Sequence, residues 1–173
     1  MRKYDLDGND VWTHQFGTSD RDEAHGVSVH ASGVYVAGRT FGTLPGQASA
    51  GGSEPGRRDT FVRKYDLDGN EVWTRQFGTS AHDEAHGVSV DASGVYVAGH
   101  TGGTLPGQTS AGELDAFVRK YDFDGNEVWT RQFGTSAHDE AYGVSVDASG
   151  VYVAGHTGGT LPGQTSAGEL DAF

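Results

Sequence analysis

The sequence predicts an all-β protein built from repeated four-stranded antiparallel sheets. Residues 118–173 repeat residues 62–117 with only two changes, and residues 1–61 form a more diverged third copy. The 28 glycines and 35% hydrophobic residues indicate many turns between thin layers of strands rather than a helical core. The two changes are Leu67 to Phe123 and His86 to Tyr142, and the first copy carries five extra residues around Gly51 to Arg58.

Each copy begins with a predicted hairpin. Residues 115–122 alternate apolar and polar side chains and lead into residues 123–126, Phe-Asp-Gly-Asn, which is typical of a tight turn. Residues 127–134 are rich in β-branched and aromatic side chains and end at glycine, so they are predicted to be the returning strand.

A second hairpin follows a polar connection at residues 135–140. Its strands are predicted at residues 143–147 and 151–155, with Ala-Ser-Gly as the turn. A loop rich in Gly, Pro, Ser and Thr, residues 157–168, then leads to Asp-Ala-Phe at residues 171–173. Four short antiparallel strands in 56 residues match the size of one propeller blade.

These motifs resemble a known repeat family. Gly-Val-Ser-Val-Asp-Ala-Ser-Gly-Val-Tyr-Val-Ala-Gly-His-Thr, a loop, and then Asp-Ala-Phe-Val-Arg-Lys-Tyr-Asp-x-Asp-Gly-Asn-Glu-Val-Trp are similar to the bacterial beta-propeller repeat called SBBP. The resemblance covers the chain three times over. It implies a β-propeller fold and a structural module of extracellular or cell-surface bacterial proteins, with no catalytic motif shared by the family.

We therefore expect one β-propeller array over residues 1–173, with repeats at 1–61, 62–117 and 118–173, and about three four-stranded blades per chain. One blade is split between the termini, because joining Phe173 to Met1 regenerates the motif Asp-Ala-Phe-Met-Arg-Lys-Tyr-Asp. Three blades fall below the usual range of roughly four to eight. We expect two chains to close a six-bladed ring head to tail; a nine-bladed trimer and a longer chain with more repeats are the alternatives.

Composition excludes several partners. The 24 acidic and 12 basic residues give a net charge of −12, which disfavours nucleic acid and anionic membranes. No apolar stretch approaches the roughly 18 residues needed to span a bilayer, and the first residues lack the apolar segment of a secretory signal. With no cysteine, disulfides and thiolate metal sites are absent.

An acidic pair precedes the presumed innermost strand of every copy. In a propeller this connection lies at one mouth of the channel, where a ring of carboxylates would bind cations or basic groups. Solvated surface carboxylates are the more common reason for such residues, and that interpretation is favoured. The pairs are Asp22 and Glu23, Asp83 and Glu84, and Asp139 and Glu140.

Two histidines are further candidate ligand contacts. His100 and His156 follow Val-Ala-Gly and face the long loop, and Arg39 takes their place in the first copy. Exposed polar residues are common in such loops, so the histidines are expected to be solvent-exposed unless a ligand binds there.

The hairpin turns resemble the start of a calcium loop. An EF-hand also needs an acidic fifth position and a glutamate at the twelfth, where this chain has Asn70 and Phe77. Hairpin closure by Asp and Gly is therefore favoured, no cofactor is expected, and a weak Ca²⁺ site is kept as an alternative. Its candidate ligands are Asp66, Asp68, Asp122 and Asp124.

No catalytic constellation emerges. His82-Asp83-Glu84-Ala85-His86 superficially resembles the zinc-protease pattern, but its Glu is one place late and its context is a loop entering a strand. The tryptophans that recur once per copy, Trp12, Trp73 and Trp129, are expected to pack between blades.

We therefore expect a non-enzymatic scaffold or protein-interaction module. The alternative is a multivalent propeller, lectin-like or cation-binding, with one equivalent site per blade and a protein or glycan ligand. An enzyme would need its site at the channel mouth or in the insertion at residues 51–58.

Overall fold

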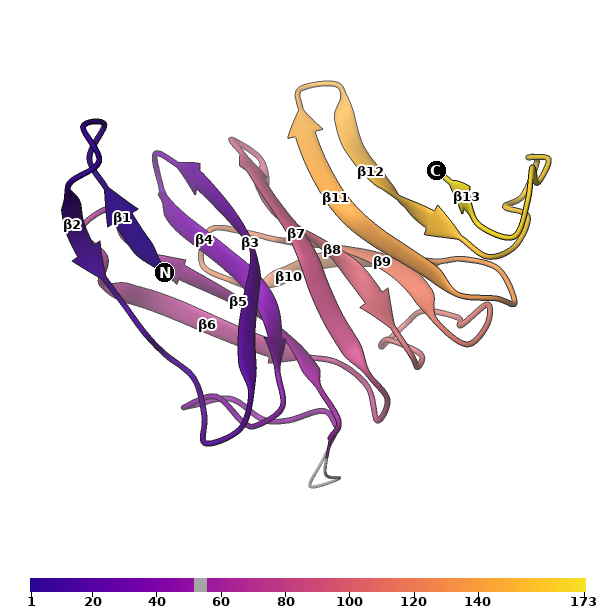
Figure 1. Ribbon diagram of the computed structural model, residues 1–173, viewed down its shortest axis with the longest axis horizontal. Helices are drawn as coiled ribbons and strands as arrows, with labels where there is room; N and C mark the ends of the chain where they lie inside the picture. Colours follow the sequence, from indigo (N-terminus) through magenta and orange to yellow (C-terminus); the bar gives the residue numbers. More distant parts are fainter. Residues whose placement is uncertain (52–55) are drawn as a thin grey trace.

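The computed structural model describes residues 1–51 and 56–173, and these form β-strands joined by turns and loops (Figure 1). The strands are β1 (Arg2–Tyr4), β2 (Asp10–Thr13), β3 (Asp22–His30), β4 (Gly33–Thr40), β5 (Asp59–Tyr65), β6 (Glu71–Phe77), β7 (Asp83–Asp91), β8 (Gly94–Thr101), β9 (Asp115–Tyr121), β10 (Glu127–Phe133), β11 (Asp139–Asp147), β12 (Gly150–Thr157) and β13 (Asp171–Ala172). No helix in the described part of the chain is long and apolar enough to cross a bilayer.

Two complete antiparallel sheets occupy the middle of the array, in the orders β3-β4-β5-β6 and β7-β8-β9-β10. A two-stranded sheet, β1-β2, and a three-stranded sheet, β11-β12-β13, lie at its two ends (Figure 1). This is the predicted order of two strands, two whole blades, two strands and a stub. Each complete sheet takes its first two strands from one sequence copy and its last two from the next.

Local sequence sets the outer hairpin of each sheet. In the turn after β9, the amide of Asp122 donates to the carbonyl of Asn126 at 2.9 Å, and Gly125 has a φ of 81°. Glycine adopts this left-handed conformation without steric cost, so the Asp-Gly-Asn sequence closes the predicted hairpin.

The sheets that begin with β3, β7 and β11 are called the first, second and third units. A β-bulge interrupts the first strand of each unit. In β7 the pairing with β8 shifts between Ala85 and Gly87, which leaves His86 as the extra residue. Equivalent bulges occur in β3 and β11. Beside the bulge the two backbones lie very close together. A Cβ on Gly99 would therefore overlap the carbonyl oxygen of Glu84. Only glycine fits there.

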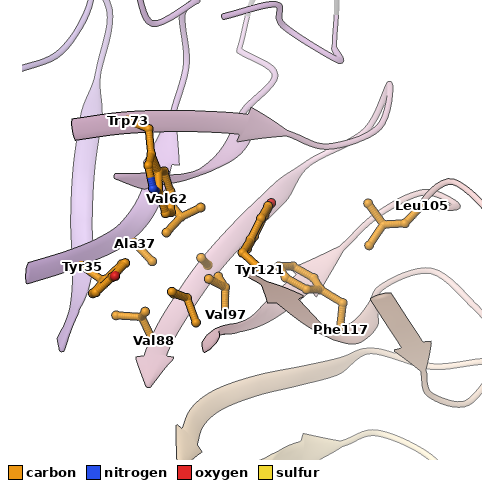
Figure 2. Close-up of a cluster of buried hydrophobic side chains, with 11 residues drawn as sticks. Tyr35, Ala37, Val62, Trp73, Val88, Val97, Leu105, Phe117 and Tyr121 are labelled. Carbon is orange, nitrogen blue, oxygen red and sulfur yellow. The ribbon is translucent and has the colours of Figure 1, made fainter. Parts of the chain in front are cut away.

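Apolar side chains fill the space between neighbouring sheets (Figure 2). Trp73 of β6 contacts Tyr35 of its own sheet and Tyr121 of the next, with ring centroids 6.0 Å and 6.3 Å apart. Its indole N–H donates to the carbonyl of Phe123 at 3.0 Å. The prediction that Trp73 packs between blades is confirmed.

The start of the innermost strand differs from the sequence prediction. The innermost strand was expected to begin at Gly143, but β11 begins at Asp139, because the first residues of the supposed polar connection pair with β12. The insertion expected at residues 51–58 includes residues 52–55, which lie outside the described residues.

The strands nearest the two ends of the described chain, β1 and β13, are shorter than the equivalent strands β5 and β9. β13 pairs with β12 through Ala172 and Asp171 and then stops, whereas the equivalent β9 continues to Tyr121. β1 has nearly the same sequence as the second part of β9 and lies at the opposite end of the array (Figure 1).

Candidate functional site

The first strands of the three units, β3, β7 and β11, contact one another in order along the array. They are the inner strands, since each lies at one edge of its sheet and contacts the corresponding edge strand of the neighbouring sheet. The predicted acidic pairs lie at their starts, which brings one aspartate and one glutamate per unit to the same end of the inner face.

The aspartates of the acidic pairs are structural. The Asp83 carboxylate accepts a 2.6 Å hydrogen bond from the Thr79 amide and also accepts the Thr79 hydroxyl, and Asp139 accepts the same bonds from Thr135. Both aspartates are fully buried, and burial raises the pKa of Asp83. The expectation of solvated surface carboxylates is wrong for Asp83 and Asp139, because the neighbouring loops cover them.

Asp22 occupies the equivalent place in the first unit. Its carboxylate accepts the Thr18 amide at 2.6 Å and the Thr40 hydroxyl. The side chain is partly covered. All three aspartates thus tie the preceding loop to the inner strand.

The glutamates lie on the opposite side of the strand from these aspartates, because successive strand residues alternate faces. A single guanidinium connects two of them: Arg39 Nη2 is 2.5 Å from Glu23 Oε2, and Arg39 Nη1 is 2.5 Å from Glu84 Oε2. Arg58 Nε approaches the same Glu84 oxygen at 3.1 Å. Glu84 is 4% exposed, so the surface interpretation is also wrong for this residue.

These contacts decide the ionisation of Glu84. Burial alone would raise the pKa of this carboxyl, but hydrogen bonding from Arg39 and the nearby positive charges lower it below its ordinary value. Glu84 is therefore a stable anion held by two guanidinium groups.

His100 takes the place of Arg39 in the next unit. Its Nδ1 lies 3.2 Å from His86 Nε2 and 3.6 Å from Glu140 Oε2. His100 is 3% exposed, so the expectation of an exposed loop residue is wrong: the bulged β7 and the next inner strand, β11, enclose it. Burial lowers the pKa of His100 to about 4 and also lowers that of His86.

Glu140 differs from the two other glutamates in its partners. Its carboxylate accepts the Tyr142 hydroxyl at 3.1 Å and lies near His100. Within residues 1–51 and 56–173, no lysine or arginine is within ion-pair distance of it. Glu140 is the inner-face glutamate that has histidine in place of a guanidinium.

His156 has the same sequence position in the third unit but different surroundings. Its ring packs against Tyr142, with centroids 5.4 Å apart, and it is only half-buried, because among the described residues no inner strand covers the side of β11 that faces away from β7. His100 and His156 are thus not equivalent, although their sequence contexts are nearly identical.

The turn aspartates act in hairpin closure. Asp66 accepts the backbone amide and the side-chain amide of Asn70, each at 2.8 Å, and Asp122 accepts the same groups of Asn126. These hydrogen bonds lower the pKa of both carboxyls. In the described chain, the candidates Asp66, Asp68, Asp122 and Asp124 belong to no group of three metal-ligand atoms close enough for one ion.

Sequence reasoning missed the residues that bring these groups together. Arg58 was not considered, Arg39 was considered only as a replacement, and the zinc-protease comparison treated His86 apart from His100. The useful signal was variation: positions 86 and 142 differ between two copies that are otherwise nearly identical, and Arg39 of the more diverged first copy replaces the histidine found at positions 100 and 156.

Antiparallel sheets whose inner strands contact one another in series, with aromatic side chains between the sheets, define a propeller-type repeat protein. Two segments, residues 72–106 and 128–162, match the family model described as SBBP, a beta-propeller repeat. These two segments are SBBP beta-propeller repeats.

A curated relative shares this sequence pattern over most of the chain. Regulatory protein FlaEY of Caulobacter vibrioides is 31% identical over 165 residues, which cover 88% of this chain and 17% of the relative. The chain thus spans about a sixth of the length of this relative.

Proposed function

We propose that this chain is a non-catalytic structural and protein-interaction module that assembles head to tail, with two copies closing a six-bladed ring. The observation that carries the proposal is a difference in exposure between equivalent residues. Tyr35 and Tyr96 are 0% and 4% exposed inside the array, whereas Tyr152, at the same position in the last sheet, is 56% exposed.

The opposite end of the array shows the same difference. Val88 of β7 is 8% exposed, but its equivalent Val27 in β3 is 63% exposed. Tyr121 of β9 is 3% exposed, but its equivalent Tyr4 in β1 is 52% exposed. Surfaces that bury large apolar side chains within the array are uncovered at both ends, and such surfaces favour association.

A hollow at one end of the array supports the proposal. A hollow of about 290 Å³ at the β1-β2 end is lined by residues that include Trp12, Val27 and Val29. Inside the array, Tyr35 fills the equivalent space beside Trp73 and Val88 (Figure 2). Tyr152 of a second copy would occupy this hollow and contact Trp12, as Tyr96 contacts Trp129 at 6.0 Å within the chain.

Backbone pairing gives the register of the junction. In the complete second sheet, Val97 pairs with Arg119 and Tyr96 with Lys120. The same register would pair Val153 with Arg2 of a second copy, so that β1 continues where β13 ends. This pairing would satisfy the unpaired strand edges of β1 and β12.

The last loop supports the same arrangement. Gln132 accepts the amide of Leu105 at 2.9 Å and donates to the carbonyl of Gly103 at 2.9 Å, which holds the loop after β8. Gln76 makes the same bonds to the loop after β4. In a closed ring, Gln15 of a second copy would take this place beside the loop after β12.

Light scattering coupled to size exclusion tests the proposal over a wide concentration range. A species of twice the 18.2 kDa chain mass supports the six-bladed ring, and three times that mass supports the nine-bladed alternative. A folded monomer at every concentration contradicts assembly.

Cysteine trapping tests the register, because the chain contains no cysteine. Oxidising a mixture of the Arg2→Cys and Val153→Cys variants should give a covalent dimer, since paired antiparallel residues are within disulfide reach. The matched control replaces Arg2→Cys by Asp7→Cys, in an exposed turn. Equal cross-linking in both mixtures contradicts the proposed register.

A multivalent binding role is the second candidate, favoured by the shared conformation of the loops after β4 and β8. Equal stoichiometry per loop in a titration with a glycan panel would support it. A regulatory role through protein contact is compatible with either candidate and with the name of the FlaEY relative.

A further inference from the structure

His86, His100 and Glu140 form a compact group on the inner face, where β7, β8 and β11 meet. Their nearest ligand atoms, one from each side chain, all lie within 4.8 Å of one another. Glu84 and His100 are direct cross-strand partners, and the bulge in β7 turns His86 toward His100. Bulges commonly redirect a side chain in this way.

We propose that His86, His100 and Glu140 bind a zinc-type divalent cation between the second and third inner strands. Two imidazole nitrogens and one carboxylate oxygen are a donor set that suits Zn²⁺, and a water molecule would take the fourth position. The two nitrogen donors distinguish the site from the calcium alternative, since calcium prefers oxygen ligands.

The distances agree with this coordination. Ligand atoms about 2.0–2.1 Å from a tetrahedral ion lie about 3.3 Å from one another. The His86 Nε2 to His100 Nδ1 distance is 3.2 Å, and the His100 Nδ1 to Glu140 Oε2 distance is 3.6 Å. A small movement of the Glu140 side chain, which is 20% exposed, is enough to complete the site.

In the preceding unit, a positive charge lies beside the inner-face glutamates at the position equivalent to His100. There, Arg39 lies between Glu23 and Glu84 and pairs with both. His100 occupies the same position one unit later, so Glu140 has no guanidinium. A bound divalent cation would supply the positive charge that Arg39 supplies in the first unit, and would leave His86 and His100 as neutral ligands.

A second group, His25, Glu84 and His86, fits a cation less well. Glu84 is already paired with Arg39 and Arg58, and these positive charges repel an ion at that place. His86 offers Nδ1 to this group and Nε2 to the other. The third unit has Tyr142 in place of His86, so it lacks the histidine pair.

The site lies within one chain, so the proposal goes beyond head-to-tail assembly and does not depend on it. Calorimetric titration of the untagged chain with ZnCl₂ in a non-coordinating buffer near neutral pH should give one ion per chain. Replacement of the ion by Co²⁺ should give the visible absorption of a tetrahedral centre.

Substitutions that test the zinc site can be taken from the equivalent positions of the other repeats. His86→Tyr and His100→Arg introduce the residues found at the equivalent positions of the third and first units, so the sheets accommodate them. Each should weaken zinc binding at least ~10-fold, since losing a ligand costs at least as much as losing a group that supports one. Glu140→Gln is a milder variant that should act in the same direction.

His156→Arg is the matched control, because it makes the same change outside the group and should leave zinc affinity unchanged. Zinc binding that survives His100→Arg but is lost in His25→Tyr would assign the ion to the other group and overturn the proposal. Absence of binding at millimolar zinc would also overturn it, and would identify His86 and His100 as a hydrogen-bonded pair.

Discussion

Arg39 of β4 and Glu84 of β7 are ion-paired across the boundary between two sheets, with 2.5 Å between Nη1 and Oε2. The same guanidinium pairs with Glu23 of its own sheet at 2.5 Å. One side chain therefore fixes the inner strands of two neighbouring units relative to each other.

Arg39→Ala should lower the free energy of unfolding by about 3 kcal/mol, because it leaves the buried Glu84 carboxylate without one of its partners. Chemical denaturation measures this loss. Arg21→Ala is the matched control: Arg21 also pairs with Glu23, but its side chain is 67% exposed, and such surface pairs contribute at most about 1 kcal/mol. Equal losses in both variants would contradict the bridging role of Arg39.

The buried His100 should make stability fall with acidity in metal-free protein. Its pKa is about 4 in the folded chain, against an ordinary value of 6.5, so the unfolded chain binds the proton first. Stability from this group is complete above pH 6.5 and is lost as pH falls toward 4. The charged groups around it are Glu84 on β7, Glu140 on β11 and Arg58, with His86 also nearby.

Thermal unfolding between pH 7 and pH 5, in the presence of a chelator, checks this. His100→Arg should reduce the decrease in melting temperature over that interval, because arginine does not titrate there. His156→Arg is the matched control, because it makes the same substitution at a half-buried position outside this group. An unchanged pH dependence in His100→Arg would show that other groups dominate.

Gln132→Ala should loosen the loop after β8 without unfolding the sheet. Its side chain bonds Leu105, Gly103 and, at 2.7 Å, the Asp115 carboxylate. Hydrogen exchange at the Leu105 amide should accelerate, because that amide loses its acceptor. Leu44 serves as an internal reference, since its amide is held by Gln76 and should keep its protection.

The sequence predicted the hairpins well because their determinants are local. Asp66, Gly69 and Asn70 close a turn through contacts within five residues, and alternation in the strands fixes which side chains face the neighbouring sheet. The order of two strands, two whole four-stranded sheets and two further strands could also be predicted, because the repeated motifs follow one another in a fixed order.

The candidate site could be predicted only in part. Asp83 and His100 were expected at the surface, but their burial depends on loops and inner strands that lie far from them in the sequence. The approach of His86 to His100 depends on the bulge in β7, which identical repeats do not reveal. Near-identical sequences, such as those around His100 and His156, acquire different environments because one is inside the array and the other is at its end.

Tyr152→Ser should weaken assembly while leaving the single chain folded. Tyr152 is 56% exposed in the single chain but would be buried against Trp12 of a second copy. Its substitution should therefore raise the dissociation constant of the assembly and leave the folding of the single chain unchanged. Burial of a large aromatic side chain contributes about 2 kcal/mol, which corresponds to a roughly 30-fold increase in the dissociation constant. Concentration-dependent light scattering or sedimentation measures this change.

Val128→Ser is the matched control for Tyr152→Ser. Val128 is 53% exposed, a similar value, but its equivalent Val72, which lies inside the array, is also 52% exposed, so this position is not covered by a neighbouring sheet. Its substitution should leave the dissociation constant unchanged. If the two variants weaken assembly equally, general surface hydrophobicity drives association; if neither does, the two ends meet through other residues. Only a selective effect of Tyr152→Ser, matched by Trp12→Ala from the opposite end, supports completion of the split blade by a second copy.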